Sequence, residues 1–270
     1  MPAESDAPIT FSFGKNWEEF VRTCFSQERV ENARRHLLEF LGLPDLRGHY
    51  FLDVGCGSGL HSLAAQRAGA ERIVSFDLDP ASVRTTQRLH EMAGSPASWR
   101  VLTGSALDQQ FLKTLEPADC VYSWGVLHHT GKMWEAVENA ASLVKPGGLF
   151  YIGLYTTSPR SGYWTRVKLK YNRASSLGKR WMEARYATIT LALCCTRLEN
   201  PIRYISEYTK KRGMDFMSDQ RDWLGGYPFE HASAGETVQF GTKKLGFQLV
   251  NIQAGVGAAH VSEYLFRRPE

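Results

Sequence analysis

Two aspartates and a run of alternating glycines have the types and spacing of a ligand-binding turn. Asp53 precedes three glycines at alternate positions, Gly55, Gly57 and Gly59, and Asp77 follows further along the chain. Glycines directly after a strand let the backbone turn tightly and approach a ligand closely. A dinucleotide fingerprint needs its third glycine one residue later than Gly59. The loop therefore resembles a nucleotide-binding turn but departs from the dinucleotide pattern.

The two carboxylates narrow the chemistry of the ligand. Asp53 lies at the end of a predicted strand, where a carboxylate would repel a phosphate and attract an ammonium group, directly or through water. Asp77 ends the next predicted strand, where an acid can accept hydrogen bonds from both hydroxyls of a ribose. An ammonium group beside Asp53 and a ribose beside Asp77 describe an amino-acid nucleoside without phosphates.

Short strand and helix patterns alternate around these residues. Strands are predicted at residues 50–54, 73–76, 99–102, 120–124, 149–154, 247–252 and 261–266, and helices at 27–41, 60–68, 133–144, 234–245 and from Pro80 onward. Such alternation implies a parallel sheet with helices on both faces, which binds ligands beyond the carboxyl ends of its strands. The predicted fold is α/β and Rossmann-like, a doubly wound, mostly parallel seven-stranded sheet with an N-terminal helical cap and a helical insertion after the fifth strand.

Four segments follow from this pattern. Residues 1–48 form an N-terminal cap or lid, and residues 49–155 form the ligand-binding core. Residues 156–233 form a helical insertion or lid, and residues 234–270 supply a helix and strands that complete the core.

From residue 50 to residue 155 the chain resembles the class I S-adenosylmethionine-dependent methyltransferases. The motifs that carry the resemblance are the run from Asp53 to Gly59, Asp77 at its spacing, the loop after Trp124, and the turn Pro146-Gly147-Gly148 before the fifth strand. The resemblance implies S-adenosylmethionine as the cofactor. The cofactor-binding residues it implies are Asp53, Gly55, Gly57, Gly59, Asp77, Leu78, Ser105, Ala106 and Trp124.

Two further segments resemble motifs of a bacterial, small-molecule branch of these enzymes. They are residues 11–17 and the loop Asp222-Trp223-Leu224-Gly225-Gly226-Tyr227-Pro228-Phe229-Glu230. We expect both segments to act as lid elements over the cofactor.

Three side chains are candidates for the chemistry itself. His128 could deprotonate a hydroxyl acceptor near neutral pH, as could its neighbour His129. Asn139 could bind an amine or a carbonyl group, and Tyr171 could stabilise a sulfonium through its ring face. Each residue also has a purely structural interpretation, as a capping, packing or solvated side chain.

Several functions are compatible with these residues. The first is methyl transfer to a hydroxyl, amine or carboxylate of a natural-product or quinone-like small molecule. The second is a cyclase (azetidine-2-carboxylate synthase), in which the α-amino group of S-adenosylmethionine displaces methylthioadenosine. In this reaction Asn139 or a backbone carbonyl would hold the amine, and an aromatic such as Tyr171 would lie near the sulfonium. Methylation of nucleic acid and non-catalytic sensing of the cofactor are further alternatives; the Asn-Pro-Pro-Tyr type of motif is missing after the fourth strand.

The composition of the chain limits the kinds of binding partner that it is expected to have. The 270 residues carry a formal net charge of +4, too mild to indicate nucleic acid, and the five cysteines form no CxxC pair that would indicate a disulfide framework or zinc site. Residues 156–215 hold 13 Lys and Arg against 4 Asp and Glu, so the rest of the chain is acidic. We expect a cytoplasmic protein with a small-molecule substrate, no metal, no nucleic-acid partner and no membrane span; nothing in the sequence indicates its oligomeric state.

Overall fold

The computed structural model describes residues 11–196, 200–212, 216–255 and 261–270. The chain divides into two compact units, which are described separately. The sheet unit comprises Phe13–Pro159 and Glu230–Glu270, and the helical unit comprises Arg160–Phe229 with the residues up to Ser12. Residues 1–10 of the predicted N-terminal cap lie outside the described residues.

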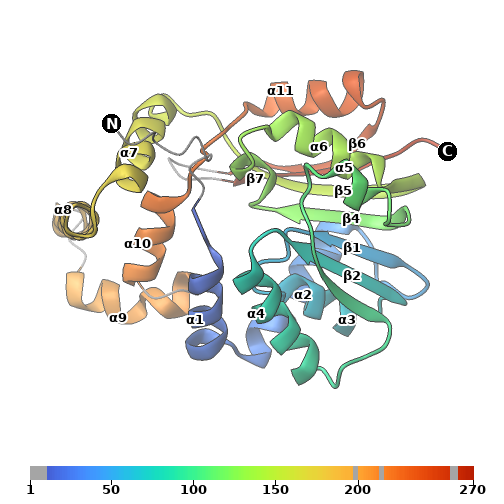
Figure 1. The fold of residues 1–270 in the computed structure, drawn as a ribbon, viewed down its shortest axis with the longest axis horizontal. Helices are drawn as coiled ribbons and strands as arrows, with labels where there is room; N and C mark the ends of the chain where they lie inside the picture. Colours follow the sequence, from blue (N-terminus) through green and yellow to red (C-terminus); the bar gives the residue numbers. More distant parts are fainter. Residues whose placement is uncertain (1–10, 197–199, 213–215, 256–260) are drawn as a thin grey trace, which may run out of the picture. The chain divides into compact units, whose positions relative to one another are not determined.

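Seven strands form one sheet in the sheet unit (Figure 1). They are β1 (Tyr50–Val54), β2 (Arg72–Asp77), β3 (Trp99–Thr103), β4 (Ala118–Trp124), β5 (Val144–Tyr155), β6 (Gln248–Gln253) and β7 (Val261–Arg267). Their order is β3-β2-β1-β4-β5-β7-β6. The pairs of β7 with β5 and with β6 are antiparallel, and all other pairs are parallel. This confirms the predicted Rossmann-like fold. The strand order reverses between β1 and β4, the place where such sheets bind ligands.

Helices cover both faces of the sheet. Those of the sheet unit are α1 (Gly14–Cys24), α2 (Gln27–Leu41), α3 (Leu60–Arg67), α4 (Pro80–Met92), α5 (Gln109–Leu112), η1 (Leu127–His129), α6 (Met133–Ser142), α11 (Ala234–Gln239) and η2 (Phe240–Lys244). In Figure 1, α5, α6 and α11 lie on one side of the sheet and α2, α3 and α4 on the other. All five residues of β1 are buried, as expected for a parallel strand that is covered on both faces.

The end of α6 differs from its prediction. A helix was expected through residue 144 and a turn at Pro146-Gly147-Gly148, but α6 ends at Ser142 and β5 already begins at Val144. Val144 pairs with Ala118, and the register with β4 then shifts. Strand pairing thus overrides the local turn signal, and the Pro-Gly-Gly segment becomes an irregularity within the strand.

The helical unit contains four helices in its described part. They are α7 (Ser161–Arg173), α8 (Ser176–Thr196), α9 (Pro201–Arg212) and α10 (Phe216–Gly225), so the helical insertion predicted after the fifth strand is present. A small apolar cluster forms around Ala187, Tyr208 and Phe216. Among the described residues, no helix has both the length and the apolar character needed to cross a bilayer.

Candidate cofactor site

Asp53 is held in place by a chain of buried side chains. Its Oδ2 accepts a hydrogen bond from the Ser62 hydroxyl, which lies 2.7 Å from the Ser75 hydroxyl, and the Trp99 indole donates to Ser75 at 2.8 Å. These residues come from β1, α3, β2 and β3, and all four are buried. These hydrogen bonds therefore fix the orientation of the Asp53 carboxylate at the start of the glycine loop.

The environment of Asp53 favours a cation. Burial raises the pKa of this carboxyl to about 7, the Ser62 hydrogen bond partly opposes the rise, and the charge of nearby Asp77 adds to it. An ammonium group brought close to the carboxylate would lower the pKa again, because an opposite charge stabilises the ionised form. Asp53 thus fits the amino group of an amino-acid ligand.

Asp77 is oriented by two backbone amides. The N–H of Gly57 donates to Oδ2 at 2.9 Å, and the N–H of Asp79 donates to Oδ1 at 2.8 Å. An ionised carboxylate has about four acceptor positions, so each oxygen can still accept from a hydroxyl. Burial raises the pKa of Asp77, and the backbone hydrogen bonds oppose the rise. Asp77 therefore fits a ribose with two adjacent hydroxyls.

The glycines of the loop are required by their surroundings. All three have a positive φ, including +79° at Gly55 and +52° at Gly57. A Cβ on Gly55 would lie 2.3 Å from a Val126 methyl, and one on Gly57 would lie 3.0 Å from Trp17 Nε1. Both the conformation and the packing therefore exclude larger residues at these two positions.

The start of α1 is attached to the same loop. Trp17 contacts Gly57, and the N–H of Gly14 donates to Asp79 Oδ2 at 2.9 Å. A Cβ on Gly14 would lie 2.5 Å from Ala81 Cβ. The sequence did not single out Asp79 or Ser62; the available signal for Asp79 was its position before Pro80, where it caps α4. The lid role expected for residues 11–17 stays a prediction.

The predicted cofactor-binding residues Leu78 and Ser105 lie in segments that adjoin Asp77. Leu78 is 67% exposed at the end of β2, and the N–H of Gly104 donates to the Asp77 carbonyl at 3.0 Å, which joins the loop after β3 to β2. The Ser105 hydroxyl accepts from the N–H of Leu107 at 3.1 Å. An exposed apolar side chain next to the ribose acid gives a base a surface to pack on.

Asn139 supports this loop. Its Nδ2 donates to the carbonyl of buried Ala106 at 2.9 Å. The amide group predicted to bind substrate is thus bonded to the backbone of the loop after β3, which favours a positioning role.

Trp124 ends β4, which lies across the switch point from the strands that carry Asp53 and Asp77. Its Nε1 donates to Glu263 Oε1 at 3.0 Å, and its ring covers Gly153. Glu263 also accepts a hydrogen bond from the Tyr151 hydroxyl. The indole, 41% exposed, therefore lies at the carboxyl-terminal part of β5 and the amino-terminal part of β7.

The two histidines after β4 have different surroundings. His128 is fully buried, its Nδ1 accepts the N–H of Tyr155 at 3.3 Å, and its carbonyl accepts the N–H of Glu230 at 3.0 Å. Acceptance at Nδ1 places the hydrogen of the neutral ring on Nε2. His129 is half-buried, with its ring 5.0 Å from that of Phe13 and 5.4 Å from that of Tyr155. These positions favour His129 over His128 for contact with a substrate.

Tyr171 belongs to the helical unit. Its hydroxyl donates to Glu183 Oε1 at 2.7 Å, and Glu183 also accepts from Arg221 Nε at 3.2 Å. Burial and this hydrogen bond raise the pKa of Tyr171 well above its usual range. The role predicted for Tyr171 beside a sulfonium stays a prediction.

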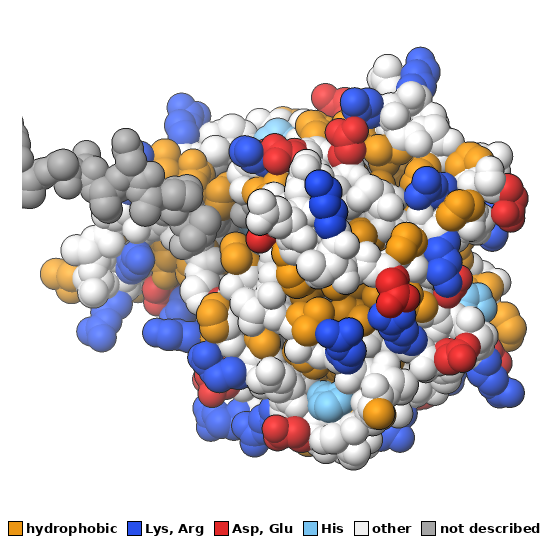
Figure 2. Space-filling view, turned by 45° about the vertical axis from the view of Figure 1, so that its right-hand side comes forward, with side chains coloured by type: hydrophobic (Ala, Val, Ile, Leu, Met, Phe, Trp, Pro, Cys, Tyr) orange, Lys and Arg blue, Asp and Glu red, His pale blue; other side chains and the backbone are white. Residues whose placement is uncertain are grey.

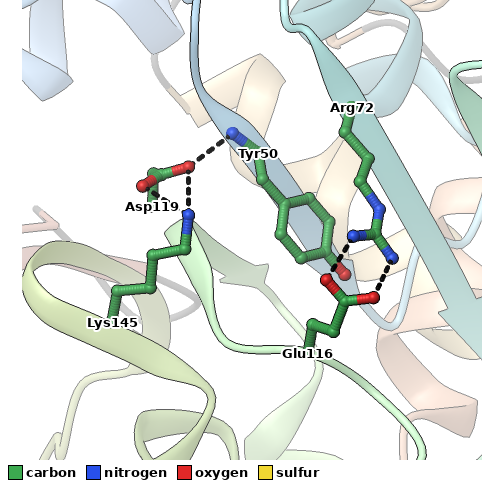
Figure 3. A network of polar contacts seen from close by, with 5 residues as sticks. All are labelled: Tyr50, Arg72, Glu116, Asp119 and Lys145. Atoms are coloured by element: carbon green, nitrogen blue, oxygen red, sulfur yellow. Dashed lines mark hydrogen bonds and ion pairs between the residues drawn. The ribbon is translucent and has the colours of Figure 1, made fainter.

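A depression of about 470 Å³ lies at the amino ends of the strands, the edge opposite the glycine loop. There Arg72 forms two hydrogen bonds with Glu116, at 2.6 and 3.1 Å, and contacts the Tyr50 ring. Asp119 accepts from the N–H of Tyr50 and from Lys145 Nζ. The charges in Figure 3 are paired with one another, which is typical of a structural contact between strand ends.

Comparisons with known proteins show the family and the fold of the chain. The profile of a family described as "Methyltransferase domain" matches residues 26–195. The chain is 32% identical over 141 residues to the ubiquinone biosynthesis O-methyltransferase of Methylobacterium sp. (strain 4-46), a match that covers 52% of this chain and 54% of that protein. It is 25% identical over 197 residues to the tRNA U34 carboxymethyltransferase of Klebsiella pneumoniae (strain 342), covering 69% and 58%. The chain spans about half the length of such curated relatives.

Solved structures show the same fold at low sequence identity. Magnesium protoporphyrin IX methyltransferase from Synechocystis PCC 6803 superposes with a TM-score of 0.55 at 11% identity, over 94% of this chain and 90% of that one. An O-methyltransferase family protein from Burkholderia thailandensis gives 0.53 at 14% identity, over 95% and 58%.

The chain belongs to the methyltransferase-domain family and has the fold of the class I S-adenosylmethionine-dependent methyltransferases. The predicted family, fold and cofactor, S-adenosylmethionine, are confirmed at this level. The cyclase alternative gains no support, because the two residues it assigned have other partners: Asn139 bonds Ala106 and Tyr171 bonds Glu183. The individual site residues stay predictions.

Proposed function

We propose that this protein transfers a methyl group from S-adenosylmethionine to a hydroxyl group of a small, natural-product or quinone-like acceptor. The proposed binding of S-adenosylmethionine rests on the position of the Asp77 carboxylate. Two backbone N–H groups, of Gly57 and Asp79, hold it at the carboxyl end of β2 and leave acceptor positions for a ribose diol. Asp53, buried one strand away, supplies the partner for the amino group.

The protein's part in the reaction is alignment and exclusion of water. When bound, S-adenosylmethionine supplies an electrophilic methyl group on a positively charged sulfur. Asp77 holds the ribose, and Asp53 fixes the amino-acid end. Trp17, against Gly57, covers the loop from the N-terminal side. Holding two reactants in line accounts for a large part of the acceleration in transfers of this kind.

A hydroxyl acceptor must also lose its proton. We assign this step to His129, which is half-buried beside Phe13 and Tyr155. We assign to His128 the positioning of this loop, through its bonds to Tyr155 and Glu230. Among the described residues, no cluster of three or more His, Cys, Asp or Glu side chains could hold a metal ion, so the assignment uses a side-chain base.

The class of acceptor is supported by relatives. Ubiquinone biosynthesis O-methyltransferases from Methylobacterium and from Rhizobium rhizogenes match this chain at 32% and 29% identity over roughly half its length. Their names describe methyl transfer to oxygen. Relatives named for tRNA and for ribosomal protein L11 also match, so the choice of acceptor needs a direct test.

The test is turnover with defined acceptors. The purified protein is incubated with S-adenosylmethionine alone, with a panel of catechols and prenylated phenols, and with total tRNA, and the nucleoside products are separated by chromatography. We expect S-adenosylhomocysteine with a phenolic acceptor. Product only with tRNA would refute the small-molecule proposal. Methylthioadenosine formed without any acceptor would refute methyl transfer and restore the cyclase.

A further inference from the structure

The outer side of α8 carries a row of exposed apolar side chains. Leu177 is 78% exposed and Trp181 is 62% exposed, and further along the helix Ile189 and Leu193 are 42% and 51% exposed. Because an α-helix turns by about 100° per residue, their spacings of four, eight and four residues spread them over an arc of about 160° on the exposed side of the helix, with Arg185 near the middle of that arc. The row runs through most of a 21-residue helix, which is about 30 Å long.

The exposed charged side chains of α8 are all positively charged. Arg180 and Arg185 are exposed, and the Arg185 guanidinium lies 5.9 Å from the centre of the Trp181 ring. Glu183 is the helix's one acidic residue, and it is buried, where it accepts hydrogen bonds from Tyr171 and Arg221. The exposed side of α8 is therefore apolar and positively charged.

The neighbouring helix has a similar surface. In α9, Ile202 is 80% exposed and Ile205 is 43% exposed, with exposed Arg203 between them. In the sequence, residues 156–215 carry a net charge of +9 while the rest of the chain carries −5. Figure 2, which brings the right-hand side of Figure 1 forward, shows that side chains of both charge signs lie among the exposed hydrophobic ones in that view. Basic and apolar groups are thus concentrated in one segment.

We propose that the exposed side of α8 binds the surface of an anionic lipid bilayer, with the helix lying in the plane of that surface. A helix with apolar side chains and a tryptophan on one side, and arginines beside them, is suited to the boundary between lipid headgroups and acyl chains. The arginines can extend their charged ends to phosphate while their stems cover apolar surface. This binding needs no span across the membrane and is independent of the methyl acceptor.

The charge and the length of the row favour lipid over an acidic protein. A bilayer offers an apolar layer and a negatively charged layer side by side over any length. An acidic protein would have to match alternating apolar and basic groups along most of a helix. The net charge of +9 supplies the complementarity to anionic lipid, where each Lys or Arg near the surface strengthens binding about fivefold.

Vesicle flotation tests the proposal on the full chain. Vesicles of phosphatidylcholine alone are compared with vesicles containing 30% phosphatidylglycerol, at low and high salt. We expect flotation with the anionic vesicles at low salt, at least tenfold weaker binding to neutral vesicles, and loss at high salt. The double variant R180Q/R185Q should bind about 25-fold more weakly, whereas R84Q/R88Q, with two exposed arginines of α4 replaced, should bind like the unaltered protein.

A second readout locates the contact. Brominated lipids quench nearby tryptophans, so part of the protein's fluorescence should be quenched on binding, and this part should disappear in Trp181→Phe while flotation persists. Leu177→Ser should weaken flotation, and the matched change Met92→Ser, at an exposed apolar residue of α4, should not.

Three results would overturn the proposal: no flotation, equal binding of R180Q/R185Q and the unaltered protein, or quenching unchanged in Trp181→Phe. If the protein ignores vesicles but is retained through Arg180 and Arg185 on a poly-glutamate resin, the surface instead recognises an acidic protein. Circular dichroism of each variant shows whether a loss of binding comes from unfolding.

Discussion

The N–H of Gly57 donates a hydrogen bond to the carboxylate of Asp77 at 2.9 Å. This bond joins the glycine loop after β1 to the acid at the end of β2. The two motifs are therefore parts of one binding surface, and Asp77 both shapes the loop and offers acceptor positions to a ligand.

Replacing Asp77 with Ala should weaken cofactor binding by at least about 30-fold, because hydrogen bonds to a charged group contribute about 1.5–3 kcal/mol each. Isothermal titration with S-adenosylhomocysteine measures the effect. Asp45→Ala, which removes an exposed acid bonded to Arg47, is the control and should bind normally. Unchanged affinity in Asp77→Ala would contradict the ribose assignment.

Asp53→Asn should stabilise the cofactor-free protein and weaken cofactor binding. The folded-state pKa of Asp53 is raised to about 7, above the value of about 3.9 in an unfolded chain. Between these two values the folded state binds more protons, so the stability of the cofactor-free protein falls as pH rises through this window. We expect Asn to raise the free energy of unfolding by about 1–3 kcal/mol at pH 8 and by little at pH 4.5, with weaker cofactor binding. Chemical unfolding at both pH values checks this; an equal effect at both would refute it.

Replacing His129 should mainly lower activity, whereas replacing His128 should mainly lower stability. His129→Ala should lower kcat about 100-fold, the usual contribution of a general base, with little change in Tm. His128→Ala should destabilise the protein by about 2–4 kcal/mol, because it opens a cavity and leaves the Tyr155 N–H without an acceptor. His128→Asn, whose Oδ1 can replace Nδ1, should recover much of the stability. A large loss of activity in His128→Asn at normal Tm would reverse the two assignments.

Lys168 should impose a pH dependence on stability. The side chain is fully buried in the helical unit, donates to the Trp223 carbonyl, and lies 4.0 Å from the centre of the Trp223 ring. Burial lowers its pKa from 10.5 to about 7, and Asp222 partly opposes the shift. Between pH 7 and 10.5 the unfolded state binds more protons, so stability should rise with pH.

Lys168→Met should remove that rise and stabilise the protein at pH 7 by about 1–3 kcal/mol, because it fills the site without burying an ammonium group. Urea unfolding at pH 7, 8, 9 and 10 measures both effects. Lys170→Met, at an exposed position two residues away, should leave the pH profile unchanged. A profile of Lys168→Met that matches the unaltered protein would refute the assignment.

The sequence predicted those features whose signals are local. The glycine loop and Asp77 lie at strand ends, and the parallel sheet then brings their positions together. Asn139 was harder to interpret, because its partner, the carbonyl of Ala106, is 33 residues away and comes from another element. Trp124 similarly depends on Glu263 of β7. The start of β5 was misplaced because the pairing of Val144 with Ala118 outweighed a strong local turn signal.

The position of β7 has a consequence for synthesis of the chain. β7 lies between β5 and β6, although it follows β6 in sequence. During translation β6 therefore emerges before the strand that connects it to the sheet exists. A premature stop anywhere before residue 261 would remove β7 and leave the preceding strand without its place at the sheet edge. The edge strand β6 thus depends on β7, a strand that is synthesised after it.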